Sequence, residues 1–178
     1  SLDDQKRLLD ACLAIPQVDP WFKHMAAGQY YLNLAWHYRG SGTVQFVTPD
    51  GWKKFGQYLP VAGKHLTHAW RLRPDLPHAA ATMVTGAKAG GDQETSTREW
   101  FDRAIHAVMD WDMAYGAYID SLLPRWGGSH RELIAFGKEC AASKRYDTRV
   151  PYTLFHIIQI IEYAADGSPE IFDNPKAY

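Results

Sequence analysis

His65 and His68 stand three residues apart and could bind a metal ion. On a helix this spacing puts both imidazoles on one face, and imidazole is a common zinc ligand. A third ligand would have to come from His78 or from a carboxylate that folding brings close. Because histidine pairs at this spacing are common on helices without any ligand role, we interpret them as surface or packing residues. We predict no metal site and no cofactor.

Two motifs with carboxylates carry an equally weak signal for catalysis. His130 and Glu132 match the His-x-Glu pattern of zinc deaminases, but the sequence has no Pro-Cys-x-x-Cys segment to complete that site. Asp110 and Asp112 could act as acid and base. Both, however, fall where a turn and the start of a helix are expected, and a carboxylate there stabilises the helix. We therefore predict no catalytic residue.

The segment Trp126-Gly127-Gly128-Ser129 is expected to form a corner between two helices. Both glycines can adopt positive φ, so the chain can reverse there without steric cost. Ser129 with Glu132 has the spacing of a capping box, which starts the next helix. Exposed Trp and Arg side chains are also frequent anchors of binding surfaces, so a ligand role stays open. The candidate binding residues are Trp36, Arg39, Trp126 and His130.

The elements that would position these residues are helices. Apolar residues at helical spacing with turn residues between them predict an all-α protein of about seven to nine helices. The stretch around residues 44–48 alternates like a strand, but a lone strand has no partner, so we expect an extended connector. Pro60 and Gly63 are expected to kink or divide the helix that Asp50 starts.

A repeat organises the middle of the chain. Residues 66–87 align with residues 101–122 at an offset of 35, which places Ala69 on Ala104 and Ala79 on Ala114. Tetratricopeptide-like repeats have a period of about 34 residues. We predict antiparallel helix pairs stacked as a short tetratricopeptide-like superhelix. The expected single domain, 1–178, has N-terminal helices in 1–60, repeat-like pairs in 64–166 and a tail in 167–178.

Composition limits the compartment and the partners. The chain has 178 residues, 46% of them hydrophobic and 22% charged, which is typical of a soluble globular protein. A net charge of −1 argues against nucleic acid as a partner. The sequence shows neither an apolar run long enough for a membrane span nor a secretory signal. We therefore expect a cytoplasmic protein that does not bind membranes.

These features predict a binding module. Stacked helix pairs form a concave face, and the 7 Trp and 10 Tyr are more than a small core needs, so some are expected to line a groove for a protein or peptide. The helix at 152–163 is apolar around most of its circumference and could form a homodimer. The alternative is an enzyme, a metal-dependent or other hydrolase, in which some of the 8 His and the carboxylates converge in a pocket.

Three features together resemble a bacterial family, domain of unknown function 4034. They are Ala35-Trp36 with Arg39-Gly40, the segment from Ala69 to Pro77, and Trp126-Gly127-Gly128-Ser129 before a helix that contains phenylalanine. The similar region covers residues 34–140. The resemblance implies a helical, tetratricopeptide-like architecture, and it implies no particular activity and no catalytic residues.

Overall fold

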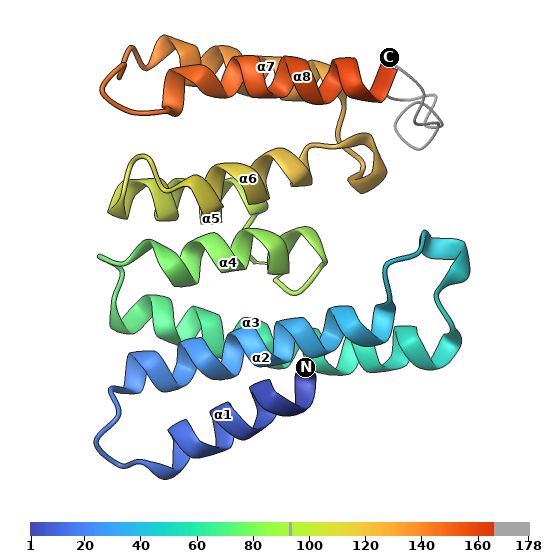
Figure 1. Cartoon of the computed structure of the whole chain (residues 1–178), viewed down its shortest axis with the longest axis vertical. Helices are drawn as coiled ribbons and strands as arrows, with labels where there is room; N and C mark the ends of the chain where they lie inside the picture. Colours follow the sequence, from blue (N-terminus) through green and yellow to red (C-terminus); the bar gives the residue numbers. More distant parts are fainter. Residues whose placement is uncertain (93, 166–178) are drawn as a thin grey trace. The chain divides into compact units, whose positions relative to one another are not determined.

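The computed structural model of the chain describes residues 1–92 and 94–165 (Figure 1). Within these residues it has eight α-helices, three short 3-10 turns and no strand, which confirms the predicted all-α fold. Contacts divide the chain into two compact units, the first of residues 1–108 and the second beginning at Met109. That the whole chain acts as one domain stays a prediction. The predicted tail, 167–178, lies outside the described residues.

The first unit is built from five helices that begin at strong local signals. Side chains of Ser1, Asp19, Thr48 and Ser96 accept a backbone N–H and so cap four of the helix starts. Proline opens α2, α3 and α4, where its missing N–H costs no helical bond. The helices are α1 (Leu2–Ala14), α2 (Pro20–Arg39), α3 (Pro49–Leu72), α4 (Pro77–Lys88) and α5 (Thr97–Ala107).

A hairpin of α2 and α3 forms the centre of this unit. Figure 1 shows the two helices side by side and α4 between α3 and α5, and α4 packs against both. A buried cluster joins α2 to α3: Leu32, Ala35, Phe55, Leu59 and Ala62. The two backbones come close at Gly28, where a Cβ would lie 2.6 Å from the Leu66 Cγ. Glycine at this position therefore permits the tight packing of α2 on α3.

Helix α3 continues through Pro60, so of the two expected effects, a kink or a division, the division is wrong and the kink stays a prediction. Proline offers no N–H to the carbonyl four residues earlier, which belongs to Gly56. Gly56 and Pro60 are both exposed, and Gly56 has no side chain beside its carbonyl. The connector before α3 also differs from the expectation: Val44–Phe46 is a 3-10 turn, η1, rather than an extended segment.

In its described part, residues 109–165, the second unit has three helices and two 3-10 turns. They are α6 (Asp112–Ser121), η2 (Pro124–Trp126), α7 (His130–Ala142), η3 (Val150–Tyr152) and α8 (Thr153–Ala165). Phe136 of α7 meets two rings of α6, with centroids 6.2 Å from Tyr115 and 4.8 Å from Tyr118. At Gly137 a Cβ would lie 2.7 Å from the Leu154 Cδ1, so glycine lets α8 pack closely on α7. Among the described helices, none has both the length and the hydropathy that a membrane span requires.

The predicted 35-residue repeat is present in the local structure. Helices α3, α5 and α7 end at residues 72, 107 and 142, an interval of 35 each time. Helices α4 and α6 begin at residues 77 and 112, after linkers of equal length, and α8 follows a longer linker that contains η3. The side chains at the aligned small positions are fully buried: Ala69, Ala79, Ala104 and Ala114. The assignment of this repeat to the tetratricopeptide-like class remains a prediction.

Candidate functional site

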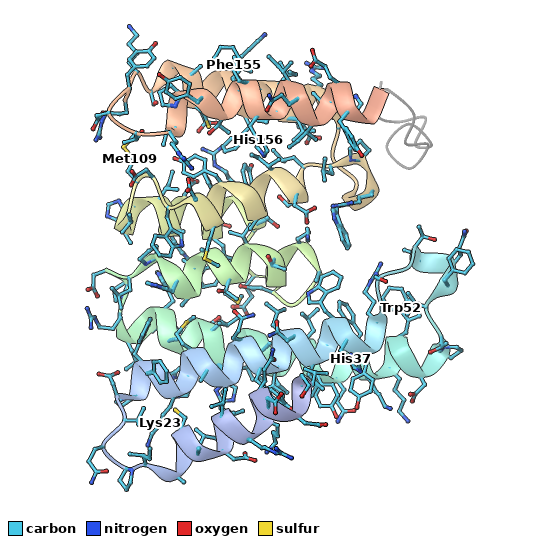
Figure 2. The ribbon with its side chains drawn as sticks, viewed as in Figure 1. Lys23, His37, Trp52, Met109, Phe155 and His156 are labelled. Atoms are coloured by element: carbon cyan, nitrogen blue, oxygen red, sulfur yellow. The ribbon has the colours of Figure 1, made fainter. Side chains whose placement is uncertain are left out.

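A pocket of about 590 Å³ opens in the second unit between α6 and the segment that contains η3 and the start of α8. Figure 2 shows His156 on the side of α8 that faces α6, whereas its neighbour Phe155 lies on the opposite side. The lining residues are Asp112, Tyr115, Gly116, Ile119, Arg149, Tyr152, Thr153 and His156. We refer to this hollow as the α6–α8 pocket.

Helical spacing explains why these residues meet. Asp112, Tyr115 and Ile119 are separated by three and four residues, with Gly116 beside Tyr115, so they form one face of α6. Thr153 and His156 are three residues apart and form one face at the start of α8. Two helical faces thus oppose each other, one carried by α6 and one by α8.

The floor of the α6–α8 pocket is apolar, and its charges lie at the rim. Tyr115 and Ile119 are buried. The Tyr115 hydroxyl donates to the backbone carbonyl of Met109 at 2.8 Å, and burial raises the pKa of this hydroxyl, so it stays neutral. At the rim, Arg149 Nη1 lies 3.7 Å from Asp112 Oδ2, and the two side chains are 87% and 73% exposed. Such a pair is weak in water, so either charge is available to a ligand.

Gly116 leaves space in the wall of the pocket. A Cβ built on it would meet no atom within 4 Å, although the residue lies in the middle of α6. Glycine in a helix interior costs about 1 kcal/mol relative to alanine, so packing gives no reason for it here. Because Gly116 has no side chain, the α6–α8 pocket is deeper at this position.

Trp36 and Arg39, two of the four candidate binding residues, meet in the first unit. The Arg39 guanidinium carbon lies 5.3 Å from the centroid of the Trp36 ring and 5.7 Å from that of Trp52. Arg39 Nη1 also donates to the carbonyls of Gly40 and Gly42, at 3.2 and 3.0 Å. Arg39 therefore holds the turn that follows α2. A binding role for either residue stays a prediction.

Trp126 and His130, the other two candidates, lie in the second unit at the expected corner, Trp126 in η2 and His130 at the start of α7. Neither residue lines the α6–α8 pocket. The two side chains are half-buried, and their binding role also stays a prediction.

The corner itself forms as predicted, but its two glycines are required for different structural reasons. Gly127 has φ +89°, the left-handed conformation that favours glycine. The expectation of positive φ at Gly128 is wrong: this residue is needed because a Cβ would overlap the backbone carbonyl of Leu122. Ser129 caps α7, and its hydroxyl accepts from the Glu132 backbone N–H at 3.2 Å and donates to the Glu132 carboxylate at 2.8 Å.

The histidine pair of α3, His65 and His68, lies beside a third imidazole, which belongs to His24 and not to His78 as expected. His24 of α2 has its Nδ1 atom 3.0 Å from Nδ1 of His65, and its ring centroid lies 4.2 Å from that of His68. His78 instead contacts Trp21, with centroids 5.8 Å apart. In residues 1–92 and 94–165, no group of three or more His, Cys, Asp or Glu side chains could hold a metal ion.

A second pocket, of about 330 Å³, lies in the first unit beside α3 and α5. Its lining consists of Trp70, Pro74, Asp102, Arg103 and His106. The Arg103 guanidinium carbon lies over two tryptophan rings, 4.3 Å from the Trp70 centroid and 4.4 Å from that of Trp100. Each of the two pockets therefore contains one histidine and one carboxylate in its lining.

Sequence reasoning did not identify the residues of the α6–α8 pocket. The one available signal was Gly116, a glycine inside the helical pattern "DMAYGAYI", where alanine would form a better helix. Helix 152–163 was identified as apolar, and in α8 the residue Phe155 is 64% exposed while Ile157 is buried. The homodimer predicted for this helix stays a prediction.

Comparison with known proteins adds no assignment. No family model matches the chain. No curated protein and no solved structure is significantly similar to it. The resemblance to domain of unknown function 4034 therefore stays a prediction, and a functional proposal has to start from the geometry of the chain's own side chains.

Proposed function

We propose that the protein is a non-catalytic binding module whose α6–α8 pocket receives a side chain of a protein or peptide partner. The observation that carries this proposal is the pocket itself, with a volume of about 590 Å³, buried Tyr115 and Ile119 at its floor and charges at its rim. Ligand sites are commonly hollows of about 300–1,000 Å³ with apolar walls and a few polar groups. In this proposal the protein acts in the cytoplasm.

The lining favours a peptide that presents an apolar or aromatic side chain. Such a side chain would lie against the rings of Tyr115 and Tyr152, where it loses contact with water. Arg149 and Asp112 at the rim can pair with charges or with backbone groups that flank the anchor residue. The two rim charges have opposite signs. They should therefore determine in which direction a peptide lies across the pocket, and they should select little for the net charge of the peptide.

The alternative function, a hydrolase with converging histidines and carboxylates, has less support. That reading calls for at least two histidines and a carboxylate in one pocket. The α6–α8 pocket has His156 with Asp112, and the pocket of the first unit has His106 with Asp102. One histidine with one carboxylate at a solvent-open rim is also what a binding surface contains.

Filling the space beside Gly116 should weaken peptide binding. Gly116→Leu adds a side chain whose Cβ would meet no atom within 4 Å, at a position that lines the α6–α8 pocket. We expect peptides selected from a random library on the wild-type chain to bind this variant at least about tenfold more weakly, a change of about 1.4 kcal/mol. Fluorescence anisotropy of the labelled peptides measures the dissociation constants.

Gly56→Leu provides the matched control. Gly56 is also an exposed glycine inside a helix, α3, and its Cβ would likewise meet nothing within 4 Å. It does not line the α6–α8 pocket, so peptide affinity should be unchanged in this variant. If the wild-type chain selects no peptide, or if Gly116→Leu binds as tightly as Gly56→Leu, the proposal is wrong.

A further inference from the structure

Three imidazoles meet where the beginning of α2 lies beside the end of α3. His24 and His65 approach with their Nδ1 atoms 3.0 Å apart, a hydrogen-bond distance. His24 and His68 have ring centroids 4.2 Å apart and tilted by 36°. In the hydrogen bond one Nδ1 must donate and the other must accept, so at least one of the two rings is neutral. If both rings were protonated, two N–H groups and two positive charges would face each other.

Aromatic rings continue this cluster along the seam between the two helices. Tyr31 of α2 stacks on His65, with centroids 5.9 Å apart and planes within 10°. Tyr31 also stacks on Tyr58 at 6.2 Å, and Tyr58 stacks on Tyr38 at 5.7 Å. The imidazoles therefore have neutral phenol rings beside them along this seam, which offer no anion to balance a positive charge.

The charged groups of the neighbouring helices provide no counter-ion either. Burial, followed by the positive charges of His68 and His65, lowers the pKa of His24. Burial and then His68 lower the pKa of His65. From α1, Lys6 acts on the tyrosines of α2 and is itself paired with Asp10. From α4, His78 contacts the ring of Trp21. Among the described residues, no carboxylate acts on His24 or His65.

We propose that the His24–His65 pair, with the ring of His68 beside it, forms a pH-sensitive latch that holds the start of α2 against the end of α3 when the pair is neutral and releases it when the pair is protonated. The latch lies in the first unit and is independent of the function proposed for the α6–α8 pocket. Release would loosen the α2–α3 hairpin at its end near α1 and would leave the buried cluster around Phe55 and Leu59 in place.

The direction of the pH dependence follows from proton linkage. Because folding lowers the pKa of His24 and His65 below the ordinary value of 6.5, the open or unfolded chain binds more protons than the folded one. The stabilisation is complete above about pH 6.5 and is lost as the pH falls toward the lower pKa values of the folded state. In that window, each additional proton that the unfolded chain binds raises the unfolding equilibrium constant by up to about tenfold for each unit by which the pH falls.

The test is urea unfolding of the full chain between pH 5 and 8 in the presence of a chelator, followed by the NMR amide signals of α2 and α3. We expect the logarithm of the unfolding constant to rise more steeply with acidity in the wild type than in His24→Gln, by about one proton. His37→Gln is the control, because His37 is an exposed histidine of the same helix. It should retain the wild-type slope.

A second measurement does not depend on any variant. NMR titration of the imidazole C–H signals in the folded wild-type chain should give His24 and His65 pKa values below the ordinary value of 6.5. Values of 6.5 or above for both residues would overturn the proposal. So would equal slopes for the wild type and His24→Gln.

Discussion

Replacing Gly128 by alanine should lower the free energy of unfolding of the chain by about 3 kcal/mol or more. A Cβ at this position overlaps the carbonyl oxygen, the carbonyl carbon and the Cα of Leu122. These are backbone atoms, which cannot move aside as the end of a flexible side chain could. The corner would have to open, and opening it displaces Ser129 from its place as the cap of α7. Urea unfolding followed by circular dichroism measures the loss.

Two other glycines of the second unit, Gly127 and Gly116, give this prediction its controls. Gly127→Ala meets no atom within 4 Å, so it should cost only the strain of a left-handed backbone, about 1–2 kcal/mol. Gly116→Ala should raise the free energy of unfolding by about 0.5–1 kcal/mol, because it improves the helical propensity of α6 without a clash. A loss at Gly128 no larger than the loss at Gly127 would contradict the steric explanation.

Trp100→Ala should cost about 3–5 kcal/mol, the range for removing a large aromatic side chain from a core. Trp100 is 1% exposed, and its ring is nearly perpendicular to that of Trp70, with the two centroids 5.5 Å apart. Its Nε1 donates to Asp92 Oδ2 at 2.8 Å and so ties α5 to the segment that follows α4. Trp52→Ala, at a tryptophan that is 39% exposed, should cost clearly less. Equal losses for the two variants would contradict the burial argument.

Trp100→Phe isolates the hydrogen bond from the burial of the ring. Burial alone would raise the pKa of Asp92, but the hydrogen bonds from Trp100 and from the backbone N–H groups of Glu94 and Thr95 outweigh it and lower this pKa below 3.8. The stabilisation from the ionised Asp92 is therefore present above about pH 3.8 and lost as the pH falls through the lower pKa of the folded state. In Trp100→Phe this loss in acid should be smaller than in the wild type, as urea unfolding at pH 2–5 would measure.

The helices could be predicted because their signals are local. Ser129 with Glu132 marked the start of α7 from residues three apart, and the alignment at offset 35 anticipated that the ends of α3 and α5 are equivalent. The first pattern depends on residues close in the chain, and the second on a constant interval. Both can therefore be recognised in a single sequence. The same holds for the all-α class.

The site could not be predicted because it depends on which helical faces meet. Gly116 and His156 belong to α6 and α8, and neither residue type indicates which face of the other helix it will oppose. His24 and His65 are 41 residues apart, and the sequence offered only His78 or a carboxylate as a third group beside the pair. Gly128 looked like a residue chosen for its backbone angles, whereas its reason is the proximity of Leu122, six residues earlier.

The proline inside α3 has a consequence for how this helix exchanges its amide hydrogens with solvent. Pro60 has no N–H to donate to the carbonyl of Gly56. One backbone hydrogen bond is therefore missing halfway along this helix of 24 residues. Transient fraying can therefore begin in the middle of α3 as well as at its tips. Deuterium uptake should divide the helix into an early half, packed on α2 through Phe55, and a later half that contains Leu66, each with its own rate.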